Sequence, residues 1–233
     1  MAETSISGLR ERKKLRTRAT LIEAAAELCL RQGFDNTTVE QIAAAADVAP
    51  RTFSRYFATK DSVIAAIADE LDAHIAGALE HQPTDITEYE ALLLAHLEVF
   101  GPALDHQTQA FKGMAVLIQI VNASSSLKAS AFAFQRASAN ASLAVLSRRM
   151  GVAPDHPAVR MVTDTWTLLF ATSFAGLGQP GNEPIESRIV CDRMCATFEL
   201  FRRSWSPTRE PEREPQREPE RAAEADPNPP QAR

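Results

Sequence analysis

The segment Asp47–Lys60 has the sequence DVAPRTFSRYFATK, and residues 50–57 within it have the pattern of a short helix. Pro50 suits a first helical turn, because the N–H group that proline lacks has no helical acceptor there. At about 100° per residue, Phe53 and Phe57 share one narrow stripe of this helix. So short a helix cannot persist alone, and we expect the two phenylalanines to anchor it to its neighbours.

The other sides of this predicted helix carry hydrogen-bond donors and no acidic residue. Arginine can bind guanine O6 and N7 with two hydrogen bonds, while hydroxyl groups and tyrosine reach phosphates. The pattern favours DNA binding over the alternative, an ordinary solvated face. The candidate DNA-binding residues on this helix are Arg51, Thr52, Ser54, Arg55 and Tyr56.

A second short helix is predicted just upstream. Thr38 and Gln41 have the spacing of a capping box, in which each side chain binds the other residue's backbone N–H. The helix that begins there ends at Asp47, three residues before Pro50. The two short helices and the turn between them predict a helix-turn-helix. The apolar residues of the upstream helix are Val39, Ile42, Ala43 and Ala46.

The charge of the chain is unevenly distributed. The formal net charge is -5, yet Arg10–Arg18 holds six basic residues and only one acidic residue, Glu11. A basic segment beside a helix-turn-helix favours contact with a polyanion, the alternative being a solubilising segment. The predicted DNA-binding arm consists of Arg10, Arg12, Lys13 and Lys14.

Helical periodicity continues along most of the chain, so the sequence predicts an all-α fold of about nine helices. The first helix, over 10–32, has an apolar stripe of Leu15, Ala19, Ile22, Ala26 and Cys29. The predicted divisions are a helix-turn-helix domain over 10–62, a helical effector-binding and dimerisation domain over 63–205, and a tail over 206–233. The later helices are expected over 60–80, 85–100, 104–122, 125–150, 155–177 and 183–205.

The predicted tail differs in composition from the rest of the chain. Pro211, Pro215 and Pro219 recur every four residues among charged residues, and no large apolar residue follows Trp205. Proline at this spacing excludes a continuous helix. We expect a disordered tail, with partner binding as the alternative.

Several classes of protein find no support in the sequence. No apolar run approaches the roughly 18 residues that a membrane span needs, and the N-terminus lacks a secretory signal. The three cysteines have no CxxC spacing, which fits a reducing cytoplasm. No histidine pair or glycine-rich phosphate loop is present, so we predict no enzyme, no cofactor and no metal. Cys191 and Cys195 are four residues apart on a predicted helix, where packing is favoured over a zinc site.

The sequence TTVEQIAAAADVAPRTFSRYFATKDSV resembles the DNA-binding domain of the TetR (tetracycline repressor) family, and T-F-x-x-Y-F-x-x-K at 52–60 is its most specific part. The resemblance implies an all-helical homodimer whose C-terminal domain binds a small effector and dimerises through its last two helices. It implies that Thr38, Thr52, Tyr56 and Lys60 hold phosphates. We assign base reading to Arg51, Ser54 and Arg55.

Two positions depart from the family pattern. Asp47 stands where the turn usually has glycine, and it tolerates the left-handed conformation at some cost. Ala49 stands where a capping serine is frequent, which forfeits about 1 kcal/mol of helix stability. Neither position removes a DNA-contacting group.

The C-terminal half offers candidates for an apolar site. Trp166, Phe170 and Phe174 repeat every four residues, a stripe that is more typical of a core or a dimer interface than of a ligand pocket. The segment SLKASAFAFQRASANASLAVLSRRMGVAPDHPAVR is loosely similar to regulators related to the mycofactocin system, some of which sense fatty-acyl thioesters, and this favours an apolar effector. The predicted pocket residues are Phe100, Phe111, Met114, Leu117, Phe132, Trp166 and Phe170.

Taken together, these patterns predict a cytoplasmic, ligand-responsive repressor that binds a palindromic operator in double-stranded DNA as a homodimer. The main alternative is a helical protein–protein interaction module without DNA activity. A small-molecule-binding protein that does not bind DNA is a third possibility, which the basic arm and the two arginines disfavour.

Overall fold

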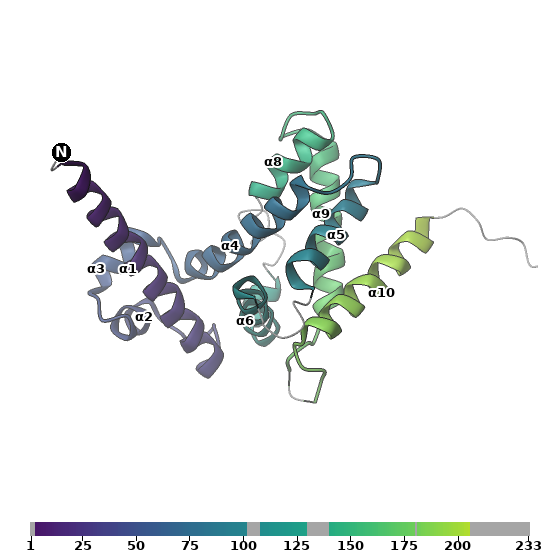
Figure 1. Ribbon diagram of the computed structural model, residues 1–233. Coiled ribbons are helices and arrows are strands. Elements are labelled where there is room, and N and C mark those ends of the chain that lie inside the picture. Colours follow the sequence, from purple (N-terminus) through teal and green to yellow (C-terminus); the bar gives the residue numbers. More distant parts are fainter. Residues whose placement is uncertain (1–2, 102–107, 130–139, 180, 206–233) are drawn as a thin grey trace, which may run out of the picture.

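The computed structural model describes residues 3–101, 108–129, 140–179 and 181–205 (Figure 1). All regular secondary structure in these ranges is helical, which confirms the predicted fold class. The predicted pocket residue Phe132 and the predicted tail lie outside the described residues.

The N-terminal helices form the predicted helix-turn-helix. Residues from four helices share one apolar core, to which Leu21, Ile42, Phe53 and Val63 contribute. In Figure 1 the helix α4 leaves this group and continues into the second group of helices. The helices are α1 (Glu3–Gln32), α2 (Val39–Ala45), α3 (Pro50–Tyr56) and α4 (Lys60–Glu80).

The first helix differs from its prediction in two respects. It begins at Glu3 rather than Arg10. The predicted stripe was also wrong at its start, since Leu15 is 60% exposed and Ala19 is exposed as well. The reason is that α1 packs through two faces: Leu21 and Leu28 join the helix-turn-helix core, while Cys29 joins a separate cluster with residues of α4 and α6. Only the second half of α1 has neighbours on both sides, so the position of Leu15 stays in solvent.

Local capping fixes the starts of the short helices. Thr38 and Gln41 form the predicted capping box, with the Thr38 hydroxyl accepting from the Gln41 N–H at 3.2 Å. Thr59 caps α4 in the same way. Asp47 takes a φ of 53°, the left-handed conformation that the turn was predicted to need. Ala49, as expected, gives α3 no side-chain cap.

The remaining helices form a bundle around the C-terminal part of α4. In this bundle α4 contacts α5, α6 and α8, while α10 contacts α9 and α5. Leu79, Leu92, Met114 and Val159 lie in the shared core. Figure 1 shows α10 beside α5 and α9, at the end of the bundle away from α1. The helices are α5 (Glu88–Phe100), α6 (Gln109–Ala123), α8 (Asn140–Arg149), α9 (Pro157–Phe174) and α10 (Ser187–Trp205).

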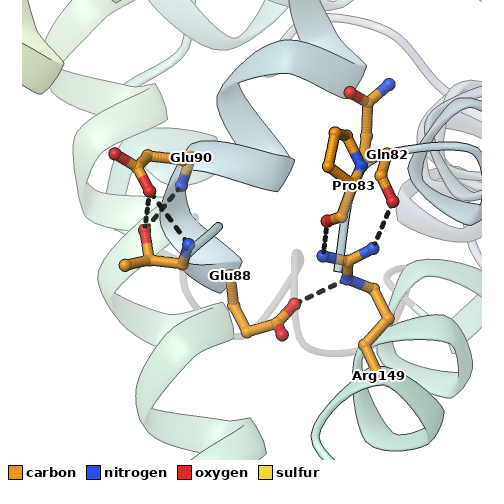
Figure 2. Close-up of polar contacts among 6 residues, drawn as sticks. Gln82, Pro83, Glu88, Glu90 and Arg149 are labelled. Atoms are coloured by element: carbon orange, nitrogen blue, oxygen red, sulfur yellow. Dashed lines mark hydrogen bonds and ion pairs between the residues drawn. The ribbon is translucent and has the colours of Figure 1, made fainter. Parts of the chain in front are cut away.

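One buried arginine joins α8 to the loop between α4 and α5 (Figure 2). The guanidinium of Arg149 donates to Glu88 Oε2 at 2.8 Å and to the carbonyl oxygens of Gln82 and Pro83 at 2.9 and 2.7 Å. Its side chain is only 8% exposed, so the charge depends on these partners. This contact stabilises the end of the bundle near the C-terminus of α4, which is the end farthest from the helix-turn-helix.

Candidate functional site: a nucleic-acid interface and an apolar cavity

The helix α3 is held by its two phenylalanines, as predicted. Phe53 and Phe57 are 1% and 5% exposed, and their ring centroids lie 5.8 Å apart. Burying each phenylalanine contributes roughly 2–3 kcal/mol, enough to hold a helix of this length against fraying. The opposite side of α3 is therefore presented to solvent in one fixed orientation.

The polar side chains of α3 lie on that solvent side. Arg51, Ser54 and Arg55 are exposed, whereas Thr52 and Tyr56 are half-buried. The Arg55 guanidinium lies 5.1 Å from the Tyr56 ring centroid and donates to its hydroxyl oxygen at 3.4 Å. The predicted orientation of α3 is thus confirmed, while contact with DNA stays a prediction for these residues.

Lys60 is placed differently from the phosphate-binding role expected of it. Its ammonium donates to the carbonyl oxygens of Phe34 and Thr37, at 2.8 and 3.1 Å, and lies 4.3 Å from the Phe34 ring centroid. An ammonium has three N–H groups, so at most one is left for a phosphate. Lys60 chiefly closes the turn between α1 and α2.

The residues of the basic arm and Thr38 are exposed to solvent. Thr38 is exposed at the first turn of α2, where backbone N–H groups favour an anion. All four predicted arm residues are also exposed, and Lys14 pairs with Glu11 at 3.7 Å. The exposed residues of the arm are Arg10, Arg12, Lys13 and Lys14.

A cavity of about 440 Å³ lies inside the bundle, bounded by α4, α5, α6, α8 and α9. Its volume falls within the range of small-molecule sites. Of the predicted pocket residues, Met114, Leu117, Trp166 and Phe170 line it. Phe174 lines it too, so the aromatic stripe of α9 faces a cavity rather than only packed core.

Two predicted pocket residues do not line the cavity. Phe100 and Phe111 are 1% and 3% exposed and belong to the packed core of the bundle. The ring of Phe100 packs against the rings of His96 and Phe170, two residues that line the cavity, with centroids 5.6 and 6.4 Å away. The assignment of both residues was wrong, because periodicity identifies a buried face but not which buried residues border an empty space.

A neutral histidine forms part of the cavity wall. Nδ1 of His96 lies 2.7 Å from the Leu92 carbonyl oxygen, and the Trp166 indole N–H donates to Nε2 at 3.3 Å. This pattern places the proton of the neutral ring on Nδ1, because Nε2 must accept. Burial disfavours the charged form and lowers the pKa of His96 to about 4.

Asp72 and Asn122 are among the other polar wall residues, none of which was predicted from the sequence. Asp72 accepts from the backbone N–H groups of Ala141 and Ser142 at 2.8 and 3.2 Å, and burial raises its carboxyl pKa. Asn122 donates to the carbonyl oxygens of Phe174 and Leu177. The sequence did hold one indication of Asp72, because it is an acidic residue on the apolar side of α4. No such indication marked Asn122, near the end of α6.

The described ranges contain no group of three or more His, Cys, Asp or Glu side chains placed to bind a metal ion. Within the same ranges, every helix is too short or too polar for a membrane span. Cys29 is buried and Cys191 and Cys195 are half-buried, and burial raises the pKa of all three thiols.

These features together define a class: a protein with a helix-turn-helix domain joined to a helical bundle that contains a cavity. Residues 21–67 match the family described as bacterial regulatory proteins, tetR family. The match lies within the N-terminal part of the chain that holds the helix-turn-helix.

One characterised relative matches over a longer stretch. The chain is 42% identical over 106 residues to the HTH-type transcriptional regulator TcmR of Streptomyces glaucescens. The match covers 46% of this chain and 47% of the relative, so the chain spans about half of the length of the relative that it matches.

Solved structures show a looser likeness. Thermus thermophilus FadR, a TetR-family transcriptional repressor in complex with lauroyl-CoA, matches with a TM-score of 0.49 and 22% identity over 83% of this chain and 97% of its own. The multidrug binding protein EbrR, complexed with ethidium, matches with a TM-score of 0.44 and 15% identity over 78% and 98%. Similarity at this level does not carry either ligand over to this chain.

Proposed function

We propose that this protein is a ligand-responsive transcriptional regulator, a repressor that binds a palindromic DNA operator as a homodimer. The observation that carries the proposal is the face of α3, where exposed Arg51 and Arg55 stand opposite the buried Phe53 and Phe57. Arginines held in this way can dock in a major groove and read guanine. The match of residues 21–67 to the tetR family supports the same function.

The test compares two double variants in a DNA-binding titration. Fragments that the purified protein retains from genomic DNA serve as specific sites, and unrelated fragments serve as competitors. Arg51→Ala with Arg55→Ala should reduce the preference for the retained fragments, since each arginine that reads a base is worth about 1–3 kcal/mol. Lys112→Ala with Arg160→Ala removes the same charge from exposed positions of the second domain and should leave the preference unchanged.

Salt dependence separates this function from the alternative of a protein interaction module. Binding through phosphate contacts must weaken steeply as the salt concentration rises, because counterions are released from the DNA. Equal preference of the arginine variant and the wild type for the retained fragments would contradict base reading by α3. Binding that does not depend on salt would contradict the proposal as a whole.

The cavity supports a small, predominantly apolar effector. Apolar and aromatic side chains form most of its wall, with a few polar groups such as Thr163, Asn122 and Lys128. That composition is typical of sites where apolar contact gives affinity and a few polar groups fix orientation. A ligand that fits one state of the bundle better than another would shift the spacing of the two recognition helices in a dimer.

Exposed apolar residues on α9 and α10 support the homodimer. Among the large apolar side chains that the described residues expose, Met161, Leu168 and Leu200 lie on these two helices, at 63%, 54% and 67% exposure. A second copy covering them would remove this apolar surface from water. Two recognition helices could then meet half-sites roughly 34–36 Å apart.

A further inference from the structure

A carboxylate in the helix-turn-helix domain reaches across to the bundle. Asp35, in the turn between α1 and α2, accepts from the Ser124 hydroxyl at 3.1 and 3.2 Å through its two oxygens. The Ser126 hydroxyl also donates to Asp35. Hydrogen bonds to a charged acceptor are stronger than neutral ones. We call this set of contacts the Asp35 link.

The bundle side of the link is the start of a helical turn. Residues 125–129 are helical, and the Leu127 N–H donates to the Ser124 oxygen at 3.2 Å, as in a helix N-cap. The Ser124 hydroxyl therefore accepts from its own turn and donates to Asp35, and its oxygen also lies 3.0 Å from the Ser126 hydroxyl oxygen. Movement of this turn must change the geometry at the carboxylate.

An apolar cluster lies beside the link and joins the same two parts of the chain. Cys29 and Phe34 from the N-terminal domain pack in it with Ile64 of α4 and with Ile120 and Leu127 of the bundle. Packed interiors resist gradual deformation, so such a cluster transmits displacement rather than absorbing it.

The segment that holds the link also forms the wall of the cavity. Leu117, Val121 and Leu127 line the cavity and pack in or against the interdomain cluster. Asn122 and Lys128, on either side of Ser124, line the cavity as well. A ligand in the cavity thus touches the residues that position Ser124 and Ser126. The same segment contacts the helix-turn-helix domain on the side away from the cavity.

We infer that the Asp35 link transmits occupancy of the cavity to the helix-turn-helix domain, with Asp35, Ser124 and Ser126 as its positioning residues. The inference rests on the proposed function, since it gives the cavity a regulatory effect. The link holds the turn between α1 and α2 in the orientation seen here. A ligand that displaces the turn at 125–129 weakens the link and changes the orientation of α1, α2 and α3 relative to the bundle.

The test measures amide hydrogen exchange in the full chain with the cavity empty and filled. The cavity is filled in two independent ways: with the uncharged fluorescent probe 1-N-phenylnaphthylamine, and by Thr167→Phe, which projects a ring from the cavity wall. In the wild type, filling should change exchange in residues 33–38 and 50–57 by about fivefold or more, the lower end of typical coupling between sites.

Asp35→Ala and Ser126→Ala should reduce this response, while exchange around the cavity still changes on filling. The response of the double variant to filling should be no smaller than that of the more affected single variant, because substitutions that break the same link do not have additive effects. Ser125→Ala is the matched control. Ser125 is an exposed serine of the same turn, and its side chain leaves the helix in a different direction from that of Ser126. The variant should respond as the wild type does.

A wild-type response that Asp35→Ala and Ser126→Ala leave intact would overturn the inference. So would a Thr167→Phe variant with unchanged exchange in residues 33–38. Failure of the probe to bind would count against the proposed effector site, and the Thr167→Phe comparison would still decide whether the link transmits. Loss of DNA binding by the arginine variants, by contrast, has no bearing on the link.

Discussion

Two titratable side chains in this protein serve packing and geometry rather than reaction chemistry. The ammonium of Lys60 is bound to two carbonyl oxygens of the turn between α1 and α2. The His96 ring lies between Leu92 and Trp166 and is neutral because burial lowers its pKa to about 4. The contacts of each residue within the fold account for its position.

The lowered pKa of His96 makes stability depend on pH. Between pH 4 and 6.5 the unfolded chain binds a proton at this ring that the folded protein does not bind, so the free energy of unfolding decreases as the pH falls through this window. From pH 7 to pH 4.5 we expect a loss of about 2 kcal/mol from this group.

Urea denaturation of the wild type and His96→Gln at both pH values measures this contribution. Glutamine keeps a donor and an acceptor but does not titrate, so the variant should lose less stability on acidification. Asp72 and the other carboxyl groups are common to both proteins and cancel in the comparison. An identical loss in the two proteins would show that His96 does not carry the effect.

At the scale of single elements, the short helices α2 and α3 illustrate how local sequence and tertiary contact share the work. The start of α2 is fixed locally by the capping box of Thr38 and Gln41. The start of α3 has Pro50 but no side-chain cap at Ala49, so α3 depends more on its two buried phenylalanines. The helix α3 is thus the less well capped of the pair.

Ala49→Ser should stabilise the N-terminal domain by about 1 kcal/mol, since a serine side chain at this position can accept from a backbone N–H in the first turn of α3. Ala49 already has the extended backbone of an N-cap, with φ -71° and ψ 149°. The midpoint of thermal or urea unfolding followed by circular dichroism measures the gain. Ala58→Ser, at an exposed position just after α3, is the control and should have little effect. Equal midpoints for Ala49→Ser and the wild type would contradict the capping argument.

At the scale of the whole molecule, α4 connects the two functional parts. Its first half contributes Val63 and Ala66 to the helix-turn-helix core, and its second half lines the cavity with Leu71 and Ile75. Because α4 belongs to both parts, it is a second connection between the helix-turn-helix domain and the bundle, beside the Asp35 link. If two copies pair through α9 and α10, a change in the orientation of the helix-turn-helix domain relative to the bundle would change the distance between the two copies of α3.

Leu168→Arg with Leu200→Arg should convert the proposed dimer into a monomer, because two desolvated charges in an apolar interface are costly. Size-exclusion chromatography with light scattering gives the mass directly. Leu15→Arg with Leu94→Arg changes two exposed leucines elsewhere and should leave the mass unchanged. A wild type that is monomeric at all concentrations, or a dimer that survives the first double variant, would contradict pairing through these helices.

The sequence alone was sufficient for the all-helical fold, for the helix-turn-helix and for the side of α3 that faces solvent, because these follow from helical periodicity and capping over a few residues. The cavity could be predicted only in part: Met114, Leu117, Trp166 and Phe170 line it, but Phe100 and Phe111 pack behind its wall. The inward placement of Lys60 and the Asp35 link were decided by the tertiary structure. Asp35 and Ser124 are 89 residues apart, and a contact over that separation depends on how complete helices pack, which local periodicity does not encode.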